Sequence, residues 1–368
     1  PELIAEIVKE RGLSIDWEGF QAEMRRQRER GRAAHKVDVT AGLKIATSVA
    51  HKHTPGSTKF VGYGTLRHRS TVVALLPDGG WSENQVDSMS QGQHVGVILR
   101  ETPFYGEMGG QVGDTGEIRA ERGTFGVTDT VRHSVKDNEL VVHLGEVIDG
   151  QISVNETVEA EVDQKRRLDI ARNHTATHLL QAALRQTLGS RVYQKGSLVG
   201  PERFRFDFSH LTPIAEEELT EIQRRVNEWI RQNLPVKART LPYAEAVAEG
   251  AVALFEEKYG EEVRMLTIGE PAISKELCGG THVKSTGELG TFLITGESSI
   301  GTGLHRIEAV TGRNAESLIE SRSAALQLIA NEVAGSLEEV PDKVKALVGE
   351  LEAERKKGLS LERELSRK

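Results

Sequence analysis

The chain has 368 residues, of which 38% are hydrophobic and 28% are charged, and its formal net charge is −8. This profile is typical of a globular protein with room for two or three domains. It contains no apolar run of the roughly 20 residues that a membrane helix needs, which argues against a membrane protein, and its acidic balance disfavours a protein that coats nucleic acid along its whole surface.

The first predicted elements are helical and then change to short strands. Residues 1–35 have apolar side chains at helical spacing, and because the chain starts at Pro1 within this pattern we expect a piece of a longer protein. From residue 36 to residue 162 short β-rich runs alternate with turn signals, so we interpret 36–162 as a small β-barrel domain. The expected strands are 60–63, 71–76, 94–99, 116–118, 125–128, 140–144 and 153–162.

The remainder of the chain mixes helices and strands and then becomes helical. Asp163 is a plausible cap and Gly189 a plausible stop for a helix, which is followed by helices at 214–232 and 243–248. Residues 313–368 are typical of a helical or coiled-coil tail, through which we expect self-association. The fold class is therefore α+β: a small barrel, an α+β core at 163–312 and helical segments at both ends. The strands expected in the core are 204–208, 235–241, 263–268, 291–295 and 304–310.

Four side chains form a candidate metal site. His174-Thr-Ala-Thr-His178 places two imidazoles one turn apart on a helix, and Cys278-Gly-Gly-Thr-His282 brings a thiol and an imidazole together around a glycine turn. Taken alone, a histidine pair is often a surface feature and a lone cysteine a small buried hydrophobe. Together they form a nitrogen and sulfur set suited to Zn²⁺, without the glutamate of the H-E-x-x-H metalloproteases.

Four motifs follow one another along the chain: His174–Leu180, Gln194–Ser197, Arg205–Phe208 and Cys278–His282. In that order they resemble the editing domain of alanyl-tRNA synthetases. Free-standing alanyl-tRNA editing proteins and the threonyl-tRNA synthetase editing domain share the two metal-binding pairs, but residues 1–35 resemble the close of an aminoacylation half and favour the full synthetase. The chain shows no motif for ATP, so we do not expect it to charge tRNA by itself. The segments Gly109–Asp114 and Arg306–Gly312 also favour the full synthetase, since they resemble the glycine-rich loop of its barrel and the end of its editing core.

This resemblance implies a cytoplasmic enzyme that hydrolyses Ser-tRNA(Ala) and Gly-tRNA(Ala) at a zinc site, with the tRNA(Ala) acceptor end as its partner. It also implies that Gln194 positions the ester or the water and that Cys278 takes part in catalysis. Two roles for the metal stay open: four ligands give a closed, organising site, whereas a loose ligand, Cys278 or His282, gives an open catalytic position. We favour the open position. The lone thiol agrees with a reducing compartment.

Several alternatives accompany this interpretation. Lys165, Arg166, Arg167 and Arg205 are candidate tRNA-binding residues, although such residues are often only solvated. Gly109–Asp114 is not a phosphate-binding motif and is expected to be a turn in the barrel, which can still contact tRNA if it lies near the core. Thr175 and Thr177 are expected to bond to nearby backbone. The competing function is a tRNA-binding and dimerisation module with a structural metal and no turnover.

Overall fold

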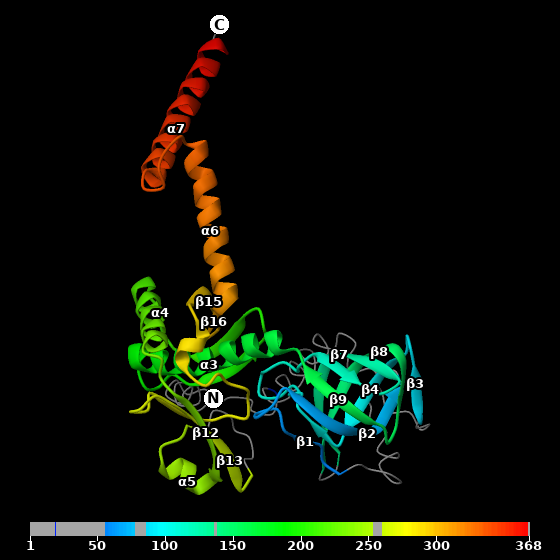
Figure 1. The fold of residues 1–368 in the computed structure, drawn as a ribbon. Coiled ribbons are helices and arrows are strands. Elements are labelled where there is room, and N and C mark those ends of the chain that lie inside the picture. Colours follow the sequence, from blue (N-terminus) through cyan, green and yellow to red (C-terminus); the bar gives the residue numbers. More distant parts are fainter. Residues whose placement is uncertain (1–18, 20–55, 78–85, 136–137, 253–259, 367–368) are drawn as a thin grey trace. The chain divides into compact units, whose positions relative to one another are not determined.

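The structure is a computed structural model that describes residues 19, 56–77, 86–135, 138–252 and 260–366 (Figure 1). Apart from Gly19, the predicted helical segment 1–35 and the first part of the predicted domain 36–162 lie outside the described residues. Backbone contacts divide the chain into two compact units. The barrel unit contains the described residues up to Gly106 together with Gly113–Asp163, and the core unit contains Glu107–Val112 and the chain from Gln164 onward.

The barrel unit is a closed antiparallel sheet. Its strands pair in the order β8-β4-β2-β9-β6-β7, and β7 pairs with β8 to close the ring, while β3 extends β8 at one end. A separate pair, β1 (Lys59–Phe60) and β5 (Glu101–Thr102), runs parallel. The other strands are β2 (Arg67–Pro77), β3 (Ser88–Ser90), β4 (His94–Leu99), β6 (Gly116–Arg119), β7 (Gly123–Val135), β8 (Asn138–Ser153) and β9 (Thr157–Val162).

Apolar side chains from every side of this ring fill its interior. Buried positions alternate along β9, where Val158, Ala160 and Val162 point inward, as expected for a strand with one buried face. His143 is also fully buried: its Nδ1 donates to the Val97 carbonyl at 2.8 Å, and its Nε2 lies 2.7 Å from the Thr102 hydroxyl. Both ring nitrogens are therefore satisfied, as a buried polar group requires.

The core unit combines two antiparallel sheets with helices. The four-stranded sheet has the order β10-β11-β16-β15 and the three-stranded sheet has the order β12-β13-β14. Its elements are α3 (Gln164–Leu188), β10 (Gln194–Val199), β11 (Phe204–Ser209), α4 (Glu216–Arg231), β12 (Val236–Pro242), α5 (Tyr243–Ala248), β13 (Glu262–Ile268), β14 (Ser274–Leu277), the 3-10 helix η2 (Thr286–Leu289), β15 (Phe292–Gly301), β16 (Leu304–Thr311), α6 (Gly312–Glu332) and α7 (Val340–Leu365).

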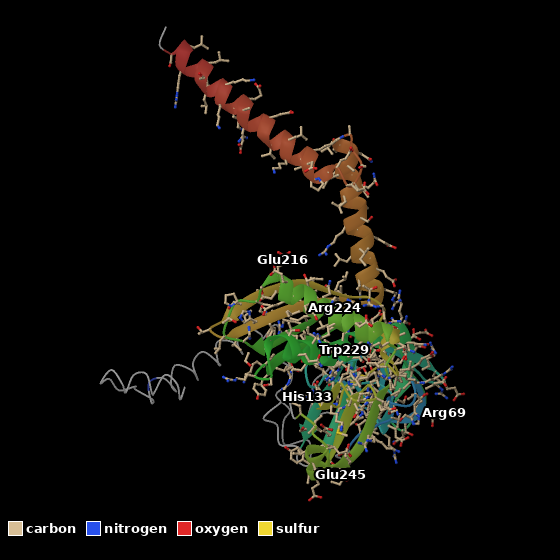
Figure 2. The ribbon with its side chains drawn as sticks, turned by 90° about the vertical axis from the view of Figure 1, so that its left-hand side faces the viewer. Arg69, His133, Glu216, Arg224, Trp229 and Glu245 are labelled. Carbon is tan, nitrogen blue, oxygen red and sulfur yellow. The ribbon has the colours of Figure 1, made fainter. Side chains whose placement is uncertain are left out.

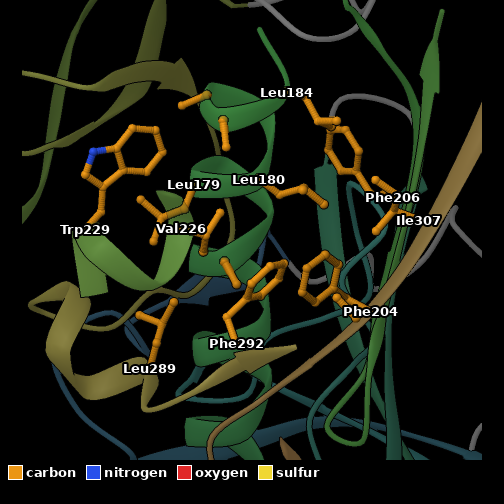
Figure 3. Close-up of a cluster of buried hydrophobic side chains, with 14 of the residues drawn as sticks. Leu179, Leu180, Leu184, Phe204, Phe206, Val226, Trp229, Leu289, Phe292 and Ile307 are labelled. Atoms are coloured by element: carbon orange, nitrogen blue, oxygen red, sulfur yellow. The ribbon is translucent and has the colours of Figure 1, made fainter. Parts of the chain in front are cut away.

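Helix α3 is enclosed by its neighbours. Every residue from Asn173 to Leu184 is buried. Figure 3 shows why: Leu179 points towards Val226 and Trp229 on α4, whereas Leu180 and Leu184 point towards phenylalanines of β11. Truncating one buried phenylalanine of this kind to alanine typically costs about 3–5 kcal/mol. The helix that carries the two histidines is therefore held rigidly by the largest hydrophobic cluster of the described residues.

The other helices of the core unit have exposed faces. On α4, Glu216 opens the first turn and Arg224 pairs with Glu221 at 2.7 Å on the solvent side, while Trp229 is buried (Figure 2). Helices α6 and α7 are separate, since the chain leaves helical geometry between Glu332 and Val340. None of the described helices is long and apolar enough to cross a membrane.

The observed elements confirm the α+β class predicted from the sequence. The strands β7 and β8 are longer than expected, and the single strand expected at 153–162 is divided: β8 ends at Ser153, Asn155 adopts a φ of 66°, and β9 starts at Thr157. Four short strands, β3, β5, β10 and β14, were not expected. Their sequences lack the longer apolar alternation by which strands are recognised.

Candidate metal centre

Two of the four predicted ligands lie one turn apart on α3. The imidazoles of His174 and His178 are stacked, with an interplanar angle of 9° and ring centroids 5.5 Å apart. Only 6% of His174 and 3% of His178 is exposed. Residues four apart on a helix share a face, so both rings are aimed at the same point from inside the core unit.

The other two predicted ligands lie on the turn that follows β14. The backbone N–H of Cys278 donates to the carbonyl of Arg264, and the Arg264 side chain donates back to the carbonyls of Cys278 and Gly280 at 2.8 and 3.0 Å. A Cβ at Gly280 would lie 2.0 Å from Cε1 of His174. The turn can therefore approach the helix this closely only with glycine at that position.

All four side chains meet in one cluster. The Sγ atom of Cys278 lies 3.4 Å from Nε2 of His174 and 3.3 Å from Nε2 of His282. Nε2 of His178 is buried without a hydrogen-bond partner. One ligand atom from each of the four residues lies within 4.8 Å of the others. Zn–N and Zn–S bonds of about 2.0 and 2.3 Å in a tetrahedron would separate N and S by roughly 3.5 Å, so these residues fit the ion.

The outward ring nitrogens have partners of their own. Nδ1 of His178 lies 2.7 Å from Oε2 of Glu276, whose other oxygen accepts from the Ser274 hydroxyl at 2.7 Å. Nδ1 of His174 lies 2.6 Å from Oε1 of Gln111. Such partners typically orient metal-binding histidines and set their tautomers. Neither Glu276 nor Gln111 was predicted from the sequence; Glu276 stands two residues before Cys278, and Gln111 lies in the glycine-rich loop.

The two threonines between the helix histidines support the cluster through hydrogen bonds to backbone. Thr177 Oγ1 donates to the His174 carbonyl at 2.7 Å, and Thr175 Oγ1 donates to the Ala171 carbonyl at 2.8 Å. Since that hydroxyl hydrogen is committed, Thr175 Oγ1 accepts from Nδ1 of His282 at 3.2 Å. Nδ1 of each of the three histidines thus bonds to a neighbouring side chain while its Nε2 faces the cluster.

Burial and neighbouring charges shift the pKa values of three of the four groups in different directions. Burial alone would raise the pKa of the Cys278 thiol, but the adjacent histidines outweigh burial and hold that pKa well below its ordinary value. Burial alone would lower the pKa of His178, but Glu276 and Cys278 outweigh it and raise that pKa to about 10. Burial lowers the pKa of His282 to about 3. The Cys278 thiolate and the neutral His282 ring are therefore in the form that binds a metal, whereas the raised pKa of His178 means that its ring must lose a proton when a metal binds.

The cluster is more open on one side. His174 and His178 are buried, whereas Cys278 and His282 are half-buried. The cluster is therefore more accessible to solvent from the side of the Cys278 turn than from the side of α3.

The predicted pocket residue Gln194 lies at the start of β10. It is 9% exposed, and its Nε2 donates to the Ser197 hydroxyl at 3.2 Å. None of the hydrogen bonds found in the described ranges joins it to the four clustered residues. Ser197, the partner of Gln194, packs closely against the glycine-rich loop: a Cβ added at Gly110 would lie 2.4 Å from the Ser197 carbonyl oxygen.

The basic residues predicted to bind tRNA do not share one environment. Arg166 and Arg205 line a cleft of about 330 Å³ together with Arg203 and Glu308. Lys165 is exposed, but only 5% of Arg167 is exposed. Arg167 is thus mainly part of the core unit and not of a basic surface.

Comparison with known proteins identifies the family of this chain. The chain is 48% identical to an alanine–tRNA ligase of Dehalococcoides mccartyi (strain ATCC BAA-2266 / KCTC 15142 / 195), and the match covers 100% of the chain and 41% of the relative. It is 42% identical to an alanine–tRNA ligase of Chloroflexus aurantiacus, over 95% of the chain and 39% of the relative. The chain belongs to the alanine–tRNA ligase family. It spans about two fifths of the length of these relatives.

Two family profiles match separate parts of this family member. The profile of tRNA synthetases class II (A) matches residues 1–166. The profile of the threonyl and alanyl tRNA synthetase second additional domain matches residues 263–308, which include Cys278 and His282. The resemblance predicted from the motifs is therefore confirmed at the level of the family.

Proposed function

We propose that this chain hydrolyses the ester bond of Ser-tRNA(Ala) and Gly-tRNA(Ala) at a zinc site formed by His174, His178, Cys278 and His282. The observation that carries this proposal is the convergence of three imidazole Nε2 atoms and one thiol in a member of the alanine–tRNA ligase family. Imidazole and thiolate are ligands that Zn²⁺ prefers.

The reason for such a site lies in the limits of amino-acid selection. Glycine is smaller than alanine, so a pocket that admits alanine cannot exclude glycine by size. Serine adds only a hydroxyl, which an apolar pocket rejects poorly. A second, hydrolytic site with its own selectivity would restore the accuracy of charging.

The division between buried and half-buried ligands supports a role for each side chain. His174 and His178, fixed by α3 and by Gln111 and Glu276, would hold the ion from the protein side. When bound, Zn²⁺ supplies positive charge that polarises an ester carbonyl or acidifies a water molecule. Cys278 and His282 face the accessible side, so we place the exchangeable position there.

Gln194 is proposed to orient the ester or the attacking water. Its side chain is largely buried and its amide already contacts Ser197, so its position is restricted. An amide carries both donors and an acceptor, and it can therefore hold a polar group without supplying charge.

The arginine cleft is the proposed contact with the tRNA acceptor end. Arg306 donates hydrogen bonds to both carboxylate oxygens of Asp207, at 2.7 and 2.8 Å. Nε of Arg205 lies 3.9 Å from the same carboxylate and is buried without a hydrogen bond. The charge of Arg205 is thus only weakly compensated by Asp207. Together with Arg166 and the exposed Lys165, it would attract phosphates, and binding should weaken steeply with salt. Arg167 is buried and is left out of this contact.

Self-association through the C-terminal helices stays a prediction. Leu347, Val348 and Leu351 on α7 are each about half exposed, as the apolar face of a helix that packs against a partner would be in a single chain. Sedimentation of the chain with and without residues 340–368 tests it.

Deacylation of mischarged tRNA tests the proposed function directly. We expect the chain to release serine from Ser-tRNA(Ala) and to spare Ala-tRNA(Ala), to lose this activity with a chelator, and to regain it with added Zn²⁺. Cys278→Ala should greatly reduce turnover, and so should His282→Asn if the first variant is poorly folded by circular dichroism. Full activity in folded, metal-free Cys278→Ala would show that the metal site is not the hydrolytic site. No deacylation by the folded, zinc-loaded chain would leave the alternative, a tRNA-binding and dimerisation module whose metal is structural.

A further inference from the structure

The first part of the glycine-rich loop, up to Val112, groups with the core unit that holds the cluster, whereas Gly113 and Asp114 lie in the barrel unit in which the whole loop was expected. The chain leaves the barrel unit at Gly106 and returns to it at Gly113, and Glu107–Val112 packs within the core unit. Val112 and Val199 anchor the loop on β10: the N–H of Val112 donates to the Val199 carbonyl, and the N–H of Val199 donates to the Gly110 carbonyl at 2.7 Å. Gly110 adopts a φ of +82°, in the left-handed region that glycine tolerates.

This loop places the amide of Gln111 between the two ligand-bearing segments. Gln111 is fully buried. Its Oε1 accepts from the backbone N–H of Thr281 at 2.9 Å, and its Nε2 donates to the Thr281 hydroxyl at 3.0 Å. The same Oε1 lies 2.6 Å from Nδ1 of His174. One amide thus bridges the Cys278 turn and the histidine of α3.

These contacts determine the tautomer of His174. A backbone N–H is always a donor, so the atom of Gln111 that faces Thr281 must be the amide oxygen and not the nitrogen. An oxygen without a hydrogen can only accept, and Nδ1 of His174 must therefore carry the proton. In this tautomer Nε2 is the nitrogen that can bind a metal, and it lies 3.4 Å from Sγ of Cys278.

We propose that Gln111 is a positioning residue of the metal centre: it sets the Nδ1–H tautomer of His174 and fastens the Cys278 turn to α3. This inference rests on the proposed zinc site. His178 has an anionic partner, Glu276, whereas His174 has a neutral one. The glutamine therefore contributes geometry without adding charge to the cluster.

Zinc affinity and the tautomer of His174 test the inference with two variants of similar size. Gln111→Met keeps the volume but has no acceptor, whereas Gln111→Glu keeps an acceptor oxygen. Competition with a chromogenic chelator should show 10- to 100-fold weaker Zn²⁺ binding for Gln111→Met, as is typical when such a partner is lost, and restored binding for Gln111→Glu. Nitrogen-15 NMR of the metal-free chain should show Nδ1–H for His174 in the unsubstituted protein and a mixture of tautomers in Gln111→Met.

Gln181→Met is the matched control. Gln181 is a buried glutamine of α3 whose one side-chain hydrogen bond among the described residues is a long one, 3.5 Å to the Val192 carbonyl. Its substitution should change neither readout. If Gln111→Met binds Zn²⁺ as tightly as the unsubstituted chain, the inference is wrong although the metal site stands. If Cys278→Ala also binds as tightly, the metal-site proposal itself is wrong, and the tautomer measurement still decides the role of Gln111.

Discussion

Replacing Glu276 by glutamine should weaken zinc binding 10- to 100-fold. Only 4% of this carboxylate is exposed, and one oxygen lies 2.7 Å from Nδ1 of His178 while the other accepts from Ser274. A hydrogen bond to a charged group contributes about 1.5–3 kcal/mol, which corresponds to roughly 10- to 150-fold in affinity. Losses of 10- to 100-fold are typical for such partners of metal-binding histidines. The two estimates agree.

The assay is competition between the chain and a chelator for Zn²⁺ at constant pH. Glu276→Gln keeps the shape and an acceptor oxygen but removes the charge, whereas Glu276→Ala removes both and should lose more. Glu297→Gln is the control, because Glu297 forms a second carboxylate–imidazole contact of 2.7 Å, with His305, outside the cluster. If Glu276→Gln binds Zn²⁺ with an affinity within twofold of that of the unsubstituted chain, the charge of the Glu276 carboxylate does not contribute to metal binding.

Three further outcomes are expected. Gly280→Ala, whose Cβ would lie 2.0 Å from His174, should lower zinc affinity at least tenfold, whereas Gly296→Ala, with no atom within 4 Å, should not; equal affinities would contradict the close approach. Arg166→Glu with Arg205→Glu should weaken tRNA binding and flatten its salt dependence more than the same charge change at Arg224 and Arg231 on α4, and equal effects would reject the cleft. Burial lowers the pKa of His143 to about 4 from an unfolded value near 6.5, so the unfolded chain takes up the proton first. His143 should therefore contribute a loss of about 2 kcal/mol in stability between pH 7.5 and pH 5, so the stability of His143→Gln, measured by urea unfolding, should fall by about that much less than the stability of the unsubstituted chain.

The metal-binding residues could be predicted because the two members of each pair are only four positions apart in the sequence. A helix brings positions 174 and 178 to one face, and a glycine pair lets Cys278 and His282 meet, so each pair is visible within five residues. That the two pairs meet each other depends on packing of α3 against β14, and only the chemistry of a shared metal suggested it from the sequence.

The supporting residues could not be predicted by the same reasoning. Gln111 is 63 positions from His174, and Glu276 is 98 positions from His178. Neither residue type signals a metal site by itself, since buried glutamines and glutamates commonly satisfy other polar groups. The short strands β10 and β14 that flank the cluster were missed as well, because their residues do not alternate between apolar and polar side chains.

The metal centre depends on a loop, residues 107–112, that lies in the sequence before the rest of the core unit. Gln111 lies in a segment bounded on both sides by residues of the barrel unit, yet its hydrogen bonds are made to Thr281 and His174 of the core unit. A chain that began at Gln164 would contain all four clustered residues but would leave Nδ1 of His174 and the N–H of Thr281 without this acceptor. Leaving buried donors unpaired costs about 1–3 kcal/mol each. Any core unit that functions without the barrel sequence must therefore supply another acceptor at this point, or bind its metal less tightly.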